Sequence, residues 1–261
     1  MQLQTFMGSL QWFDLLNRPT LAALDEIYNF NRLASPSISR ALPSAVAAEL
    51  AISLLLLPLV QVNMRRPWCQ ILGATDASTE YGFGACTAQV TEAQARQLGR
   101  WASKGDCFVR LLPDDSSTCI KEPRGILRCV HLRKRDFTTS LSAPFQFKSH
   151  INSLEADALL LYVKWLTRTP RHFARRAVVL VDSQSVIGAV AKGQSSAPGL
   201  KRQLRRLASY LLATDIATAH LCPEREQSNR RSVPPPASSC SQAPHQAETI
   251  PTTWESPISI K

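Results

Sequence analysis

Apolar positions recur at helical spacing through the first 66 residues of the chain. The segments SLQWFDLLN and PTLAALDEIYNFNRLA repeat them with a period near 3.6 residues. Pro19 opens the second segment, and proline suits the first turn of a helix because that turn leaves its N–H groups unbonded. AVAAELAISLLLLPLV predicts a third helix. We therefore expect residues 1–66 to form a small helical segment.

The most apolar stretch of the chain spans residues 45–62. It contains Glu49 and Pro58, and it falls short of the roughly 20 apolar residues that a membrane-spanning helix requires. We predict a buried helix here and no membrane partner. The N-terminus also lacks a basic region followed by an apolar one, so no signal peptide is expected.

From residue 67 the pattern changes to strands alternating with helices, which predicts an α/β domain. Strands are predicted from four segments: WCQILGATDAS, YGFGACTAQV, RRAVVLVDSQS and IATAHLCPE. INSLEADALLLYVKWLTR is the clearest helix, with an apolar stripe formed by Ile151, Leu154, Ala158, Leu161 and Trp165. SVIGAVAKG predicts a short helix that ends at Gly193, and GLKRQLRRLASYLL a longer one.

The middle of the chain has no regular period, and we expect an insertion at about residues 104–143. GRWAS and ILRCVHLRKRDF are candidate strands, and LLPDDSSTCIKEPRG between them is typical of a surface loop. Residues 228–261 are rich in Pro, Ser and Gln and are expected to be disordered.

The formal net charge of +10 favours a polyanion as partner, although a merely soluble basic protein is the alternative. The seven cysteines form no C-x-x-C pair and have irregular spacing, which argues against a disulfide framework and a zinc ribbon. These features indicate an intracellular protein, cytoplasmic or nuclear, with its thiols reduced.

Three carboxylates occupy positions that a core or an apolar stripe disfavours. Asp76 and Asp182 each end a predicted strand, and Glu155 lies beside the apolar stripe of its helix. Parallel strands end at one edge of a sheet, so the three acids would repel one another there unless a hard cation such as Mg²⁺ binds them. Structural alternatives are a helix cap or turn for each aspartate and a solvated helix flank for Glu155.

Basic residues gather in the last third of the folded region, where 13 Lys and Arg face 4 Asp and Glu between Lys164 and Arg231. One helix there buries a leucine stripe and presents four basic residues on the other face: Lys201, Arg202, Arg205 and Arg206. They suit nucleic-acid phosphates, and an ordinary solvated face is the alternative. His150 and His220 lack metal-ligand spacing, so we expect structural roles for them, with His150 either as a helix cap or as a residue that supports the acids.

The blocks TDASTEYGFGA, HINSLEADAL and VVLVDSQSVIGAVAKGQSS together resemble the ribonuclease H domain of retroelement reverse transcriptases, in particular the DIRS-like group. The resemblance implies a mixed five-stranded sheet flanked by helices over residues 67–227. Residues 1–66 resemble the thumb and connection that precede this domain. The double-aspartate motif of the polymerase is missing from the sequence, so DNA synthesis is not expected.

The resemblance also implies the chemistry. Asp76, Glu155 and Asp182 would be the catalytic residues and would hold two Mg²⁺ ions, which Mn²⁺ could replace. The reaction would be hydrolysis of the RNA strand of an RNA–DNA hybrid, which the enzyme distinguishes by its 2′-OH groups. The alternatives are a catalytically dead module that binds nucleic acid and a remnant with neither role.

The sequence departs from the family pattern in three places. Asp76 and Glu155 are 79 residues apart, which is long for this fold, and Ser183 stands where the family usually has Asn. The fourth acid, expected in a block like HVPSE.NPADAPSR, is missing from HLCPEREQSNRRSVPPP, although His220, Pro223 and Glu224 match the start of that block.

A frameshift near residues 222–228 would account for the missing acid. QSNRR and a serine codon beginning with AG can be written CAATCCAACCGACGCAG, and reading this one base later gives Asn-Pro-Thr-Asp-Ala. Sequencing the coding DNA tests this hypothesis, because codons that cannot yield Asn-Pro-x-Asp in the shifted frame contradict it. The chain would then be a decayed copy of the element that has lost one metal-ligand carboxylate.

Overall fold

The computed structural model describes residues 2–33, 40–78, 80–102, 107–112, 126–144 and 149–223. Met1–Glu224 form one compact unit, which contains both the helical segment and the predicted α/β domain. The tail predicted at residues 228–261, and with it the frameshift hypothesis, lies outside the described residues.

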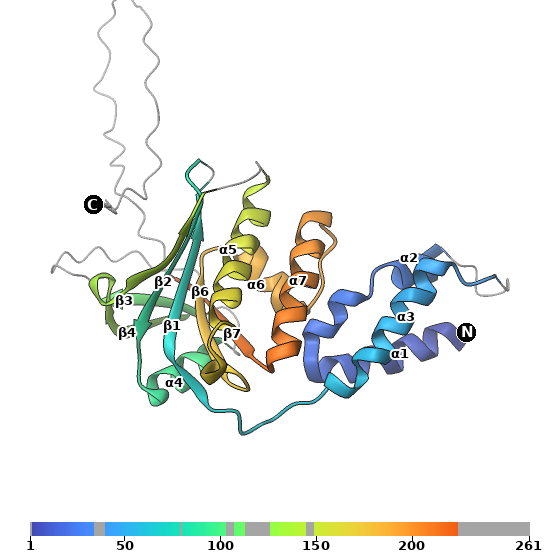
Figure 1. Ribbon diagram of the computed structural model, residues 1–261, viewed down its shortest axis with the longest axis horizontal. Coiled ribbons are helices and arrows are strands. Elements are labelled where there is room, and N and C mark those ends of the chain that lie inside the picture. Colours follow the sequence, from blue (N-terminus) through green and yellow to red (C-terminus); the bar gives the residue numbers. More distant parts are fainter. Residues whose placement is uncertain are drawn as a thin grey trace, which may run out of the picture. The chain divides into compact units, whose positions relative to one another are not determined.

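The N-terminal segment is helical, as the apolar spacing predicts (Figure 1). Its helices are α1 (Gln2–Asp14), the 3₁₀ helix η1 (Leu15–Ala23), α2 (Glu26–Leu33), α3 (Ser44–Leu56) and the 3₁₀ helix η2 (Leu57–Leu59). The single helix predicted to begin at Pro19 is instead two, because Leu24 has an extended backbone that separates η1 from α2. A small apolar core joins these helices: Met7, Leu10, Leu21, Leu24, Ile27 and Val46.

The helix α3 is less buried than its sequence predicts. Only Val46, Glu49 and Ser53, along one stripe, are buried in it, while the side chain of Leu54 is 57% exposed and that of Leu55 77% exposed. The prediction of a buried helix is therefore wrong, because α3 packs on α2 and η1 along one face only. No helix in the described ranges is long and apolar enough to cross a membrane.

The α/β region forms a mixed sheet of seven strands, in the order β4-β3-β7-β6-β1-β2-β5. The strands are β1 (Trp68–Ala77), β2 (Phe83–Gln89), β3 (Cys107–Leu112), β4 (Ile126–Arg133), β5 (Thr138–Ala143), β6 (Arg176–Val181) and β7 (Ala217–Pro223). β1, β2 and β5 form an antiparallel meander, whereas β6 is parallel to β1, and β7, β3 and β4 continue the parallel part.

The prediction of five strands is wrong because the predicted insertion contributes to the sheet. CFVRLL forms β3, which pairs with the edge of β7, and β4 pairs with β3. β5 also lies within the range predicted as an insertion, at the opposite edge of the sheet. GRWAS, expected as a strand, contributes to the end of the helix α4 (Glu92–Ala102), whose apolar side packs on β1.

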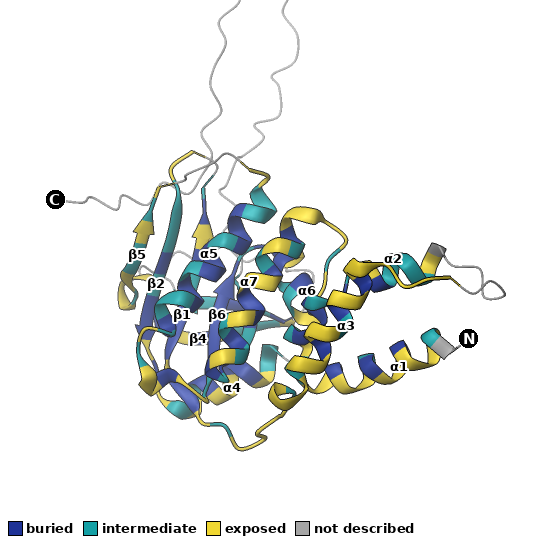
Figure 2. Ribbon diagram, turned by 45° about the vertical axis from the view of Figure 1, so that its right-hand side comes forward, coloured by how far each residue is buried: buried dark blue, intermediate teal, exposed yellow. Residues whose placement is uncertain are grey.

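Helices cover both faces of the sheet (Figure 2). α5 (Ile151–Leu166), α6 (Gln184–Lys192) and α7 (Pro198–Thr214) share one core with alternate residues of β6, and α4 covers the other face. The leucine stripe predicted in α7 is buried, and Gly193 ends α6 with a φ of 73° as expected. In α5 the buried stripe differs from the predicted one, since Ile151, Leu161 and Trp165 are only half-buried.

Candidate active site

The register of two parallel strands brings Asp76 and Asp182 to adjoining positions. Thr75 of β1 pairs with Val181 of β6; Asp76 is the next residue of β1, and Asp182 is the first residue after β6. Both lie at the carboxyl edge of the parallel strands, where α/β proteins commonly bind their ligands. The backbone therefore brings these two of the three predicted acids together.

Glu155 lies at the same end of β1 as the two aspartates. It belongs to the first half of α5, and its neighbours Leu154 and Ala158 pack against Ala77, the residue after Asp76. The residue itself is 6% exposed, which rules out the solvated helix flank as its role. Burial of Glu155 keeps its carboxylate away from solvent, in a helix that packs against β1.

The structure also tests the helix-cap alternative for Asp182. Ser183, and not Asp182, is the N-cap of α6, and its hydroxyl accepts a hydrogen bond from the backbone N–H of Val186 at 3.4 Å. Asp76 is exposed between two buried residues, and its Oδ1 accepts the backbone N–H of Ala77 at 2.8 Å. Neither aspartate therefore caps a helix.

The donor chemistry of these acids fits a hard divalent cation, because carboxylate oxygens are the ligands that Mg²⁺ prefers. The positions of the three side chains do not by themselves form a complete site for such a cation. Among the described residues, no group of three or more His, Cys, Asp or Glu side chains has a geometry that could hold a metal ion. Asp76 and Asp182 are thus the pair around which such a site would form, and Glu155 would have to join them.

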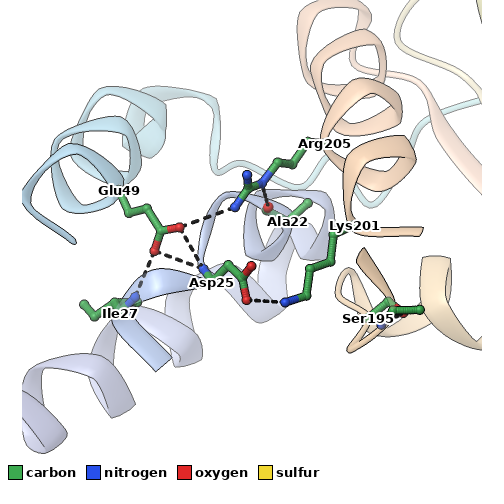
Figure 3. A network of polar contacts seen from close by, with 8 residues as sticks. Ala22, Asp25, Ile27, Glu49, Ser195, Lys201 and Arg205 are labelled. Carbon is green, nitrogen blue, oxygen red and sulfur yellow. Dashed lines mark hydrogen bonds and ion pairs between the residues drawn. The ribbon is translucent and has the colours of Figure 1, made fainter. Parts of the chain in front are cut away.

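Two of the four predicted phosphate-binding residues of α7 make contacts with other parts of the chain (Figure 3). The Nζ of Lys201 lies 2.6 Å from Oδ1 of Asp25. The Nε of Arg205 donates to the carbonyl oxygen of Ala22 at 3.0 Å, and its Nη2 lies 3.4 Å from Oε1 of Glu49. These contacts attach α7 to the N-terminal helices.

The other two basic residues of α7, Arg202 and Arg206, are exposed near Asp157 of α5. The Nη1 of Arg206 donates to Gln203 at 3.3 Å and lies 4.0 Å from Asp157. Burial raises the pKa of Asp157, and the positive charges of Arg206 and Arg202 oppose that rise. Arg202 and Arg206 therefore remain on the solvent side of α7, as the sequence predicts.

Glu49 is a buried carboxylate that the sequence did not single out for a role. Its oxygens accept the backbone N–H groups of Asp25 and Ile27, each at 3.0 Å, at the start of α2 (Figure 3). This satisfies donors that the first turn of a helix leaves unbonded. A glutamate within an otherwise apolar stretch was the available signal, but its partners lie 22 and 24 residues away and could not be read from local spacing.

The two histidines have structural positions. His150 is the N-cap of α5, and its Nδ1 accepts the backbone N–H of Asn152 at 3.2 Å, which confirms the predicted cap. His220 is buried on β7, and burial lowers its pKa to about 4. A neutral imidazole is therefore the form that the fold holds at physiological pH.

Comparisons with known proteins leave the family open. No family model matches the sequence, and a search of curated proteins finds no match.

Proposed function

We propose that the chain is a ribonuclease H-like domain from a retroelement reverse transcriptase, with the RNA strand of RNA–DNA hybrids as its substrate. The observation that carries the proposal is the adjoining placement of Asp76 and Asp182 by the Thr75–Val181 pairing. Two aspartates at one point of a sheet edge, with Glu155 buried at the same level, are an arrangement that an acid-dependent phosphodiesterase requires.

The order of the elements supports the same proposal. The TDAS block lies on β1 and the following glycines begin β2, the HINSLEADAL block opens α5, and VVLVDSQS ends β6. β5 completes the meander beside β2, although β3 and β4 intervene in sequence. The added strands lie at the β7 edge, so they leave the pairing of β1 with β2 and β6 intact.

Asp76 and Asp182 would hold Mg²⁺, or Mn²⁺ in its place, with Glu155 as a further ligand. Bound there, such cations would supply Lewis-acid activation of a water and charge stabilisation of the leaving 3′ oxygen. The chain's own contribution is to fix the two aspartates by strand pairing and Glu155 by the packing of α5. Such positioning limits the reorganisation that binding of the cation would require.

A second candidate function is nucleic-acid binding without hydrolysis. It is favoured by the lack of a three-ligand group in the described part of the chain and by the missing fourth acid of the family pattern. Arg202 and Arg206 would then contribute to a phosphate-binding surface whose occupation does not depend on the acids.

Cleavage of a labelled RNA–DNA hybrid by the full chain separates the two functions. We expect cleavage in Mg²⁺ that EDTA abolishes and that Asp76→Asn or Asp182→Asn lowers at least about 100-fold, on the scale of removing a principal electrostatic group. Glu92→Gln is the matched control, because Glu92 is an exposed carboxylate of α4 paired with Arg96. Undiminished cleavage by both aspartate variants contradicts the proposed site, and hybrid binding without cleavage supports the second candidate.

A further inference from the structure

A groove of about 720 Å³ lies between the N-terminal helices and the α/β region of the same compact unit. Its walls come from three places: η1 and α2 on one side, α6 and the following residues 194–196 on another, and the first half of α7. None of the predicted acids lines it, so the groove is distinct from the carboxylate pair.

The lining of the groove is basic and polar. Four of its residues are cationic (Arg32, Lys192, Lys201 and Arg205), against the single acid Asp25. Serine, glutamine and asparagine side chains make up much of the remainder, whereas small-molecule pockets are lined mainly by apolar and aromatic groups. A positive groove with many hydrogen-bonding groups suits a polyanion rather than an apolar ligand.

Two of the four cations are available to such a ligand. Lys201 and Arg205 are bonded to the N-terminal helices, as described above. Arg32 and Lys192 are exposed, and neither makes an ion pair within the described residues. They come from α2 and from the last residue of α6, so they provide positive charge from two walls of the groove.

The groove is connected to the candidate active site through α6. This helix begins two residues after Asp182, and five of its residues line the groove along one face: Gln184, Ser185, Gly188, Ala189 and Lys192. From the first to the last of them the helix rises about 12 Å, at roughly 1.5 Å per residue. Along the axis of a duplex, where each strand has one phosphate per roughly 3.4 Å, that length corresponds to about three or four phosphates of one strand.

We propose that this groove binds the sugar–phosphate backbone of one nucleic-acid strand, with Arg32 and Lys192 as its phosphate-binding residues. The inference rests on the proposed function, because it assigns the groove to the strand that continues from the Asp182 edge along α6. The residues 2–33 are then part of the nucleic-acid interface rather than only a segment attached to it. Recognition would not depend on base sequence, since phosphate contacts carry none.

The test is salt-dependent binding of a labelled RNA–DNA hybrid to the full chain. The double variant Arg32→Ala with Lys192→Ala should bind about tenfold more weakly and should lower the slope of log K against log salt by about 2, one unit for each lost phosphate contact. The matched control is Arg168→Ala with Arg171→Ala. It removes the same charge from exposed residues just after the C-terminal end of α5. An equal loss of slope in the control overturns the proposal.

A third variant tests the groove by shape as well as by charge. A side chain added at Gly188 meets open space, so Gly188→Glu should fit the fold and place a bulky negative group in the groove. We expect weaker hybrid binding, with circular dichroism unchanged. Unaltered binding overturns the proposal, and so does full competition by inorganic phosphate at millimolar concentration, which would indicate a site for a small anion only.

Binding and cleavage distinguish the failure of this proposal from failure of the proposed function. If the groove variants weaken binding while no hybrid is cleaved by the unaltered chain, the groove stands and the hydrolytic function fails. If the hybrid is cleaved but the groove variants bind and cleave like the control, the groove proposal fails and the function stands.

Discussion

The Nζ of Lys201 lies 2.6 Å from Oδ1 of Asp25, a residue 176 positions earlier in the chain. Both side chains are about one-quarter exposed, so the pair is partly shielded from solvent. Together with the Arg205 contacts to Ala22 and Glu49, it attaches the basic helix α7 to the N-terminal helices (Figure 3). The same pair contributes residues to the wall of the groove.

The Lys201–Asp25 pair should contribute a measurable coupling energy. In a double-mutant cycle with Lys201→Ala and Asp25→Ala, we expect a coupling energy of about 1 kcal/mol. This lies at the upper end of the range for exposed pairs because the two side chains are partly shielded from solvent. Urea unfolding measures each free energy. The Glu92–Arg96 pair, one turn apart on α4 and more exposed, is the control and should give about 0.4 kcal/mol. Simple additivity for Lys201 and Asp25 would show that the contact contributes nothing.

Glu49→Gln should lower the free energy of unfolding by about 2 kcal/mol. The carboxylate accepts the N–H groups of Asp25 and Ile27 and contacts Arg205, and hydrogen bonds to a buried charged group are worth more than neutral ones. The amide removes the charge and presents an NH₂ group where acceptors are needed. Glu26→Gln, in the first turn of α2, should cost less than about 1 kcal/mol. Equal effects of the two variants would contradict the capping role of Glu49.

Gly73→Ala should destabilise the sheet through Tyr162. A Cβ at position 73 would lie 2.3 Å from Cζ of the Tyr162 ring, which is fully buried in α5. Overpacking of this kind costs about 1–3 kcal/mol. Gly8→Ala is the control, since its Cβ meets nothing within 4 Å and alanine favours the helix α1, so a small gain in stability is expected. Thermal unfolding of the two variants in opposite directions would confirm the close approach of α5 to β1.

His220 should make the protein less stable as the pH falls from 6.5 to 4. Burial lowers its pKa to about 4, so the unfolded chain binds a proton in this range and the folded protein does not. The stability is complete above about pH 6.5 and decreases by about 3 kcal/mol by pH 4.

The variant His220→Leu isolates this contribution. The free energy of unfolding should depend less on pH in the variant, by the same amount over the same range, since Asp14 and Asp157, whose pKa values burial raises, titrate in both proteins. Parallel pH profiles for the variant and the unaltered chain would show that the pKa of His220 is the same in the folded and unfolded states.

Much of the α/β region was predictable because its elements are encoded by local spacing. The strands around Asp76 and Asp182, the helix that carries Glu155, and the cap at His150 all follow from residues within a few positions of one another. The position of Glu155 beside an apolar stripe left burial and a solvated flank as alternatives, and the structure decides for burial.

The strand β3 and the exposure of α3 were not predictable in this way. CFVRLL forms a strand by pairing with β4 on one side and with the edge of β7, more than 100 residues later, on the other. The leucines of α3 have the composition of a core, but their burial depends on which neighbouring elements are present to cover them.

The sequence by itself determined which carboxylates end strands and which helix carries the basic residues, because both are properties of consecutive residues. Only the tertiary structure decided what those residues meet. Strand pairing brought Asp76 beside Asp182, whereas docking of the N-terminal helices directed Lys201 and Arg205 to Asp25 and Glu49 and left Arg32 and Lys192 facing a groove. Such contacts join residues more than 100 positions apart, so they depend on the packing of whole elements rather than on the pattern within any one of them.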